Sequence, residues 1–516
     1  MTETLIFADH LLTGFAPDGQ AEVMQDAALL VEGPRILDLG PAERLRRQHP
    51  KAAALGGRNR LVMPGLVNAH HHVGLTPFQL GARDQPLELW FPERLCMRDL
   101  DPRLDTLYAA FEMIGSGVTT VQHLHSRAPG DTDAVVARAE TILRAYAEIG
   151  MRVSYSFAMR DQNRMIYAAD EEFLALLPGH LRAGAADYLA GFQLPLCEQI
   201  AVFQALRARW ADHPLAAIQI APSNLHWLSD AALESAARLS EETGAPMHMH
   251  LLETPYQHEY ARRRTGGSAV AFLDRLGLLS PGLTIGHGVW MTPDDIACLA
   301  ERGTCLCHNC SSNLRLKSGT LDLNAVLAAG IPTALGMDEA GINDDRDMLQ
   351  EMRLALTLHR PAGHEAPAPV AAQILRMATE YGATTTPFAG RIGRLAPGML
   401  ADLVVMDWAA VTAPWQDPAM PVIDTLVRRA KAGAVETVMI GGQVVCHEGR
   451  FTKVSRQEVH AEIARTMNRP DTEAEAARRK LAADLIGPVR DFYRGWQTPL
   501  HNFADGATSS AKSPRS

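Results

Sequence analysis

The stretch LVMPGLVNAHHHVG (Leu61–Gly74) places three histidines in a row directly after an apolar run. It is the first of eight short apolar runs that alternate, up to about residue 360, with longer segments of helical period. The eight runs are LVMPGLVNAH, GVTTVQHLH (Gly117–His125), MRVSYSFA (Met151–Ala158), AAIQIAPSN (Ala216–Asn224), PMHMHLLE (Pro246–Glu253), LTIGHGV (Leu283–Val289), TCLCHNC (Thr304–Cys310) and PTALGMD (Pro332–Asp338). Eight strand-then-helix units over about 250–300 residues favour a (β/α)8 TIM barrel over an open doubly wound sheet.

The segments on either side of this barrel have a different pattern. Residues 1–60 and 390–455 both carry short strand-like stretches, among them DAALLVEGPRILDLG and TVMIGGQVVCHEGRF. We predict that these two segments pair into one small composite β-sandwich domain, because the two ends of a domain often lie close together at its surface. Residues 61–389 would then form the barrel, 456–504 a C-terminal helical extension and 505–516 a flexible tail.

The composition restricts the class of protein and its partners. The apolar share of 47% and the charged share of 21% are those of an ordinary globular protein. The net charge of -10 argues against a nucleic-acid partner, because phosphate-binding surfaces need clustered Lys and Arg. The stretch MTETLIFADH lacks the basic and apolar regions of a secretory signal, and the apolar runs are too short to span a membrane. We therefore expect a cytoplasmic protein with no membrane partner.

The run TCLCHNC holds three of the seven cysteines, at positions 305, 307 and 310. Such a cluster can indicate a structural zinc site, but the sequence contains no second CxxC pair to complete it. The alternative is a group of reduced thiols buried on a strand.

Metal-ligand residue types recur at the carboxyl ends of the predicted strands, where the chemistry of a (β/α)8 enzyme takes place. The strand ends carry His70, His71, His72, His123, His125, His248, His250, His287, His308 and Asp338. Because side chains alternate along a strand, His70 and His72 should project to one side while His71 points away. The pair His248 and His250 repeats this spacing. An HxH pair at a strand end can bind one metal ion through two imidazoles.

Six motifs occur in one order along the chain: PGLVNAHHH, MHMHLLET, TIGHGV, HNCSSNLRLKSG, GMDEAG and IGRLAPGMLADLVVMD. Together they resemble the amidohydrolase superfamily, in particular its chlorohydrolase and aminohydrolase branch. That branch includes guanine deaminase, the methylthioadenosine and adenosylhomocysteine deaminases and the s-triazine hydrolases. The resemblance covers about residues 1–455 and implies the same barrel with a composite β domain.

The resemblance also implies a metal site and a set of residue roles. The ligands of one divalent ion would be His70, His72, His250 and Asp338. Zinc suits these donors best, although Fe²⁺, Co²⁺ or Mn²⁺ can occupy the same arrangement. No lysine stands where binuclear relatives carry a carboxylated bridging one, so the resemblance favours a single ion.

Further roles follow from the same motifs. Glu253 matches the acid/base glutamate of the family, and His287 matches the histidine that contacts the reacting water or the substrate. His308 and Asn313, in HNCSSNL, match a motif that lines the pocket.

The residue types suit a hydrolytic displacement. A divalent ion lowers the pKa of a bound water to about 7, and Asp338 can accept the proton as the water attacks an sp² carbon. Glu253 can protonate the departing nitrogen, and His287 can orient the water or stabilise the adduct. We therefore predict a deaminase or aminohydrolase that displaces an amino or amine group from an N-heterocycle or a related planar compound.

The loop after the first strand, TPFQLGARDQPLELWFPERLCMRDLD, should supply substrate contacts, since loops at this face of a barrel determine specificity. Gln79 and Trp90 are the candidates, and the indole of Trp90 can stack on a flat ring. His123 and His125 can either contact the substrate or support the metal ligands.

Two alternative functions stay open. The same site could hydrolyse amide, urea, carbamate or halogenated-ring substrates such as phenylureas or triazines, or the barrel could be a binding protein without catalysis. Glu339 and Ile342 stand where nucleoside-type deaminases carry small residues, which weakens the case for a nucleoside. In each enzymatic case the partner is a small molecule, and the family commonly forms homo-oligomers, dimers or larger.

Overall fold

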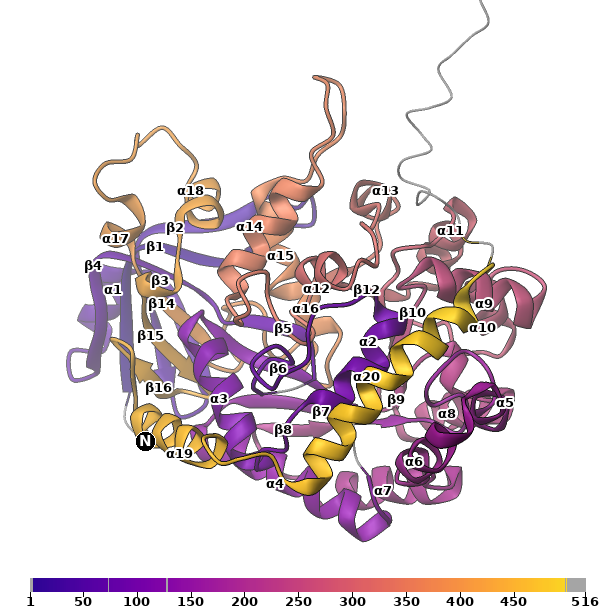
Figure 1. Ribbon diagram of the computed structural model, residues 1–516. Helices are drawn as coiled ribbons and strands as arrows, with labels where there is room; N and C mark the ends of the chain where they lie inside the picture. Colours follow the sequence, from indigo (N-terminus) through magenta and orange to yellow (C-terminus); the bar gives the residue numbers. More distant parts are fainter. Residues whose placement is uncertain (1–2, 73, 127–128, 497, 499–516) are drawn as a thin grey trace, which may run out of the picture.

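The computed structural model describes residues 3–72, 74–126, 129–496 and 498 (Figure 1). Its centre is a barrel of parallel strands, and each of the eight predicted runs contributes to it. The strands are β5 (Leu66–His71), β6 (Val118–His125), β7 (Arg152–Met159), β8 (Ala216–Ile218) with the short β9 (Ala221–Pro222), β10 (Met247–Leu251), β11 (Leu283–His287), β12 (Cys305–His308) and β13 (Thr333–Leu335).

Two parallel ladders make up the barrel wall, one in the order β5-β6-β7-β8 and one in the order β10-β11-β12-β13. Isolated parallel bridges close the gaps between them. Ile220 pairs with Met247 on one side, and His71 pairs with Asp338 on the other. The predicted (β/α)8 barrel is therefore confirmed.

Helices follow the strands along the chain and cover the barrel (Figure 1). The principal ones are α3 (Pro102–Gly115), α4 (Thr132–Ile149), α7 (Leu196–Arg209), α8 (Asp230–Thr243), α9 (Pro255–Thr265), α10 (Ala269–Arg275), α11 (Pro293–Arg302), α13 (Leu323–Ala328), α14 (Met348–Leu358) and α15 (Ala371–Met377). Helix α8 shows how particular residues set the ends of a helix. At its start, the Ser229 hydroxyl accepts a hydrogen bond from the backbone N–H of Ala232. Gly244 ends the same helix with a φ of 64°, in the left-handed region that glycine tolerates best.

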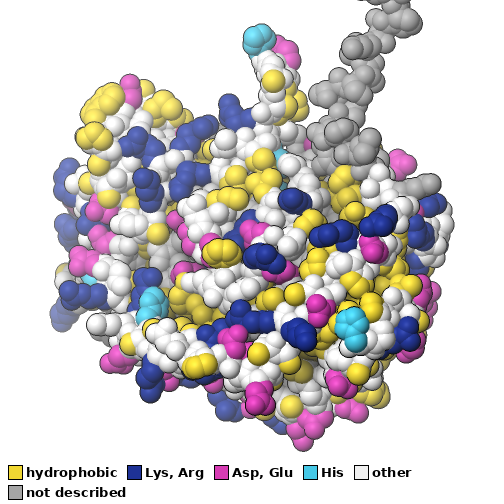
Figure 2. All heavy atoms as spheres, viewed as in Figure 1, with side chains coloured by type: hydrophobic (Ala, Val, Ile, Leu, Met, Phe, Trp, Pro, Cys, Tyr) yellow, Lys and Arg dark blue, Asp and Glu magenta, His cyan; other side chains and the backbone are white. Residues whose placement is uncertain are grey.

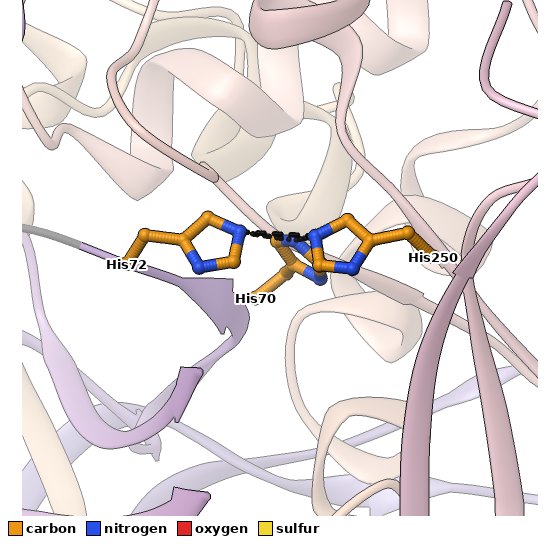
Figure 3. A group of neighbouring side chains, drawn as sticks. All are labelled: His70, His72 and His250. Carbon is orange, nitrogen blue, oxygen red and sulfur yellow. Dashed lines mark hydrogen bonds between the residues drawn. The ribbon is translucent and has the colours of Figure 1, made fainter. Parts of the chain in front are cut away.

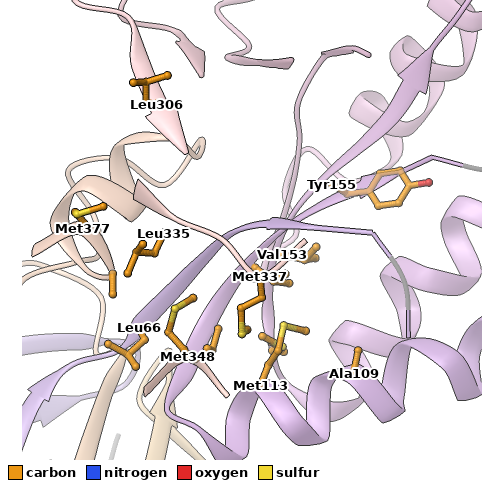
Figure 4. Packing of buried hydrophobic residues seen from close by; sticks show 14 of the residues in the cluster. Leu66, Ala109, Met113, Val153, Tyr155, Leu306, Leu335, Met337, Met348 and Met377 are labelled. Carbon is orange, nitrogen blue, oxygen red and sulfur yellow. The ribbon is translucent and has the colours of Figure 1, made fainter. Parts of the chain in front are cut away.

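The barrel core is formed by apolar side chains from strands and helices far apart in the sequence. Leu66 and Val153 from the strands share one buried cluster with Met113 from α3 and Met348 from α14 (Figure 4). Because the strands are parallel and covered by helices, nearly all of their residues are apolar or buried. This packing fixes the strand ends from which the polar side chains project.

The N-terminal and C-terminal segments share one eight-stranded sheet, which confirms the composite β domain. Its strands are β1 (Glu3–Phe15), β2 (Ala21–Glu32), β3 (Arg35–Pro41), β4 (Ala53–Pro64), β14 (Leu403–Asp407), β15 (Val435–Ile440), β16 (Gln443–His447) and β17 (Arg450–Phe451). The order is β17-β16-β15-β14-β4-β1-β2-β3, and β4 joins the two segments by pairing with β14. Ile6, Leu29 and Val405, from both segments, lie in one apolar cluster. The exact domain boundaries stay predictions.

The C-terminal segment adds α19 (Arg456–Met467) and α20 (Glu473–Tyr493). Helix α20 lies across α2 (Leu87–Glu93), in the loop after β5, and is drawn in yellow in Figure 1. Leu485 and Tyr493 of α20 pack in a separate apolar cluster with Leu95 of the same loop. The helix therefore supports the segment that carries Trp90. The predicted tail 505–516, and residues 499–504 of the predicted extension, lie outside the described residues.

Two features of the structure relate to the predicted partners, namely the distribution of surface charge and the character of the helices. On the face drawn in Figure 2, Lys and Arg side chains are interspersed with Asp and Glu. No helix among the described residues is both long and apolar enough to cross a membrane.

A buried ion pair joins the barrel to the composite domain. Arg152 Nε and Nη2 on β7 lie 2.6 and 2.9 Å from the carboxylate oxygens of Asp402, and both side chains are 1% exposed. Asp402 also accepts from the backbone N–H of Gly441, at 2.7 Å. Loss of one partner leaves the other charge buried without compensation.

We therefore expect Asp402→Ala to lower the free energy of unfolding by about 3–5 kcal/mol. Equilibrium unfolding in urea measures this change. Glu148→Ala, which breaks the exposed Arg103–Glu148 pair, is the matched control and should cost less than about 1 kcal/mol. Equal losses for the two variants would contradict the structural role of the buried pair.

Candidate metal centre and active site

Three histidines from two strand ends meet at one point (Figure 3). The Nε2 atom of His70 lies 3.0 Å from that of His72 and 3.1 Å from that of His250. The Nε2 atoms of His72 and His250 are also 3.1 Å apart. Asp338 completes the group, because its Oδ1 lies 3.1 Å from His72 Nε2 and 3.6 Å from His70 Nε2. The fold thus brings together the four residues that the motifs indicated as ligands.

The alternation of side chains along β5 separates the three adjacent histidines. His71 is buried on the side away from this group, where its ring packs edge-on against His123 with centroids 5.3 Å apart. Neither ring nitrogen of His71 has a hydrogen-bond partner among the described residues. His71 is therefore a core residue in this fold.

Each imidazole of the group is held in orientation through its Nδ1 atom. His72 Nδ1 lies 2.6 Å from the carbonyl oxygen of Leu124, and His250 Nδ1 lies 2.9 Å from that of Ser223. A carbonyl can only accept, so Nδ1 carries the hydrogen and the Nε2 lone pair faces the shared point. His70 Nδ1 lies 2.8 Å from His248 Nε2.

The protonation of these groups suits a divalent cation. Burial lowers the pKa of His70 and of His250 well below the usual value, so both rings are neutral, which is the form that binds metals. Burial alone would raise the pKa of Asp338, but its close contact with His72 and the other nearby histidines lower it. Three imidazoles and an ionised carboxylate are a common donor set for zinc and related ions.

The backbone is strained at three positions around this group. Leu252, His287 and Asp338 have φ values of 51°, 73° and 53°, in the left-handed region that residues other than glycine rarely adopt. Such strain often occurs at functional sites, where the surrounding structure imposes it. Here it turns the chain at the end of β11 and within three residues after β10 and β13, where the polar side chains project.

Glu253 and His287 lie next to the histidine group. His287 Nε2 is 3.7 Å from Glu253 Oε2 and 3.7 Å from Asp338 Oδ2, so it stands between the two carboxyl groups. Glu253 is 3% exposed, and burial raises its pKa to about 7. The Ser318 hydroxyl lies 3.4 Å from Glu253 Oε1. A carboxyl group with this pKa can exchange a proton near neutral pH.

Side chains of the HNCSSNL motif form hydrogen bonds with His287 and Asp338 and so hold both in position. Asn313 Oδ1 lies 2.8 Å from His287 Nδ1, which leaves Nε2 of that ring as an acceptor. The Ser312 hydroxyl donates to Asp338 Oδ2 at 2.6 Å. Ser312 was not among the predicted site residues. Its only signal was its place in the motif next to Asn313.

A cavity opens above the group. His72, Glu253 and Asp338 line it, and Trp90, Phe91, Arg94, Arg160, Trp227 and Glu339 are among its other lining residues. Trp90, a predicted substrate contact, therefore lines the cavity. Arg94 lies over the Trp90 ring, with Cζ 4.6 Å from the ring centroid, and its Nη2 is 3.1 Å from Glu339 Oε1. Arg160 and Trp227 were not predicted from the sequence, because they follow β7 and β9 and belong to no motif.

Five other candidates do not line this cavity: Gln79, His123, His125, His308 and Asn313. The amide of Gln79 accepts from the backbone N–H of Thr76 at 2.9 Å and donates to the Tyr108 hydroxyl at 3.0 Å. Gln79 is therefore held at the surface. Asn313 acts through His287, as described above.

The remaining three histidines are buried and bonded elsewhere. His123 Nδ1 lies 2.9 Å from the Tyr146 hydroxyl, and His125 Nδ1 lies 2.7 Å from that of Tyr155. His308 Nε2 lies 2.8 Å from His359 Nε2. These contacts turn the three rings toward neighbouring elements of the fold.

Comparison with known proteins agrees with this geometry. The model of the amidohydrolase family matches residues 61–445, and that of the bacterial imidazolonepropionase-like composite domain matches residues 27–52. The 5-methylthioadenosine/S-adenosylhomocysteine deaminase of Desulfovibrio desulfuricans is 31% identical over 87% of this chain and 94% of its own. The 5'-deoxyadenosine deaminase of Methanopyrus kandleri is 28% identical over 85% of this chain and 93% of its own.

Solved structures show the same fold. An adenosine deaminase from Xanthomonas campestris with bound zinc has a TM-score of 0.74 and 26% identity, covering 93% of this chain and 99% of that one. The atrazine chlorohydrolase of Arthrobacter aurescens TC1, complexed with zinc, has a TM-score of 0.77 at 20% identity, covering 90% and 99%. Since the family model spans the barrel and these relatives align over most of their length, the chain belongs to the amidohydrolase family and is a hydrolase.

Proposed function

We propose that the protein is a metal-dependent deaminase, which uses water to displace an amino group from an sp² carbon of a small N-heterocycle. The observation that carries this proposal is the position of Glu253. Its buried carboxyl group, with a pKa of about 7, lines the same cavity as His72 and Asp338. An amine leaves only when protonated, and Glu253 can hold the proton it needs.

The metal is proposed to be one divalent ion, with zinc as the first choice and Fe²⁺, Co²⁺ or Mn²⁺ as alternatives. His70, His72, His250 and Asp338 would hold it, and the zinc in two structural neighbours supports this choice. When bound there, such an ion lowers the pKa of a coordinated water to about 7 and so makes hydroxide available at neutral pH.

The side chains around this point divide the proton transfers between them. Asp338 is ionised and can accept a proton from water, while the Ser312 hydroxyl fixes its Oδ2 atom. His287, with Nε2 as an acceptor, can orient that water. Glu253 would deliver a proton to the departing nitrogen, so that water and the amino compound give the hydroxy or oxo product and ammonia.

The cavity walls support a flat, nitrogen-rich substrate. The rings of Trp90, Phe91 and Trp227 offer faces on which an aromatic heterocycle can stack. Glu339 Oε2 is buried and has no hydrogen-bond partner among the described residues. This oxygen could accept a hydrogen bond from a ring N–H or an amino group of the substrate. Such a bond would offset the cost of burying an unpaired acceptor.

A substrate panel tests the proposal. Zinc-loaded protein would be incubated with amino-substituted purines and pyrimidines, as free bases and as nucleosides, with amino- and chloro-substituted triazines, and with phenylureas. We expect ammonia from at least one amino-substituted ring, detected by a coupled assay. Release of chloride alone, or of an arylamine with carbon dioxide from phenylureas, would instead support the hydrolase of halogenated rings or ureas.

The pH dependence of turnover follows from Glu253. Burial raises its pKa to about 7, so the carboxyl group is protonated below that pH and loses the proton above it. Because the proposed acid must be protonated to act, kcat/KM should fall as the pH rises through about 7. A pH profile of kcat/KM measures this, and a profile that stays flat up to pH 9 would contradict the role of Glu253.

The proposal includes two further expectations. We expect a homo-oligomer, a dimer or larger, which sedimentation analysis would measure. We also expect a cytoplasmic location, which fractionation of cells producing the protein would test.

A further inference from the structure

A second group of potential metal ligands lies outside the active-site cavity. His308 ends β12, Cys310 begins the short helix α12 (Cys310–Arg315), and His359 directly follows α14. One ligand atom from each of the three lies within 4.8 Å of the others, and all three residues are buried. The group thus joins the end of a barrel strand to the end of a barrel helix.

The fold brings two histidines close to one of the clustered cysteines, in place of the second CxxC pair that the sequence lacks. Cys307 and Cys310 are spaced as a CxxC pair without a second pair, but only Cys310 belongs to the new group. Its partners are His308, two residues before it, and the distant His359. Cys305 lies elsewhere, with its sulfur 3.9 Å from the carbonyl oxygen of Pro281.

The two histidines face each other like those of the active site. His308 Nε2 and His359 Nε2 are 2.8 Å apart, compared with 3.0 and 3.1 Å for the pairs made by His70. In a tetrahedral zinc site two ligand nitrogens are about 3.3 Å apart, so a small outward movement would admit an ion.

The chemical state of the three side chains suits a thiophilic cation. Burial lowers the pKa of His308 well below the usual value and that of His359 to about 4, so both rings are neutral at pH 7. Burial raises the pKa of the Cys310 thiol, which therefore keeps its proton until a metal displaces it. Two imidazoles and a thiolate form a donor set that zinc readily accepts.

We propose that His308, Cys310 and His359 form a second metal site that binds Zn²⁺. A water or another donor would complete its coordination. The ion would stabilise the attachment of α12, which carries Ser312 and Asn313, to the end of α14. The site is distinct from the candidate catalytic centre, which contains no sulfur ligand.

Cobalt substitution separates the two sites. Only a thiolate ligand gives a sulfur-to-cobalt charge-transfer band in the near ultraviolet, so this band reports on the second site alone. We expect the band, and two Co²⁺ ions per chain by elemental analysis, for the wild-type chain. Cys310→Ser should lose the band and one ion, whereas Cys305→Ser, the matched control at another buried cysteine, should keep both.

A second variant keeps the proposal testable if Cys310→Ser does not fold. His359→Gln leaves the thiol in place, so it should lower the metal content to one ion per chain and abolish the band even if Cys310→Ser fails to fold. Zinc should also raise the Tm of the wild type more than that of His359→Gln. One ion per chain with no charge-transfer band in the wild type, or an unchanged band in Cys310→Ser, would overturn the proposal.

Discussion

Glu253→Gln should lower kcat/KM by roughly 10²–10⁴-fold while the metal content stays unchanged. The glutamine amide has nearly the shape of the carboxyl group and can still accept a hydrogen bond from Ser318, which lies 3.4 Å from Glu253 Oε1. It cannot deliver a proton to a departing nitrogen. Steady-state kinetics on a substrate found in the panel, with elemental analysis of the same preparation, measures both quantities.

Glu351→Gln is the matched control for this substitution. Burial raises the pKa of Glu351 to about 7, as it does for Glu253, but Glu351 does not line the cavity. It accepts hydrogen bonds from the backbone N–H and the hydroxyl of Ser311. We expect this variant to lose stability and to keep its turnover. Full activity in Glu253→Gln would show that another group supplies the proton.

His72→Ala should lose both the bound metal and the turnover. The substitution removes one of three converging imidazoles together with a partner of Asp338, whose Oδ1 lies 3.1 Å from His72 Nε2. The loss of metal affinity should exceed the roughly 10–100-fold that is usual when a residue hydrogen-bonded to a metal ligand is substituted. Elemental analysis after dialysis against a chelator measures it, and Asp338→Ala should behave in the same way.

His71→Ala, one residue away on the same strand, is the control for His72→Ala. Because His71 faces the core and not the metal group, this variant should keep its metal, although the cavity it creates will cost stability. A parallel loss of metal in both variants would contradict the separation of the two side chains by strand alternation.

The barrel and the pair His70 and His72 could be predicted because they depend on local patterns. Eight apolar runs with helical segments between them specify the strand order of a barrel, and alternation within β5 places His70 and His72 on one side. The convergence of strand ends in a barrel makes distant residues such as His250 and Asp338 candidates, and the resemblance of the motifs to the amidohydrolase family indicates these two as the remaining ligands.

The lining of the cavity could not be predicted in the same way. Gln79 lies in the expected loop, but its amide is engaged by Thr76 and Tyr108, contacts that depend on how the loop turns. His123 and His125 end a strand as metal ligands do, yet tyrosine hydroxyls on neighbouring elements hold their rings. These contacts are tertiary, and a single sequence has no periodic signal for them.

The missed residues show the same limit. Arg160 Cζ lies 3.8 Å from the centroid of the Trp227 ring, so these two side chains form one wall of the cavity although they are distant in sequence. Neither residue type is specific to a metal site or to a proton transfer. Only the packing of the loops after β7 and β9 brings them to the cavity.

The central claim is that a metal held by His70, His72, His250 and Asp338 drives the deamination of a heterocycle with Glu253 as the acid. The most direct test is ammonia release from the best substrate by protein that has been stripped with a chelator and then reloaded with zinc. We predict that stripping abolishes ammonia release, that zinc restores it in the wild type, and that zinc does not restore it in Glu253→Gln. Undiminished ammonia release by the stripped wild-type protein would contradict the claim.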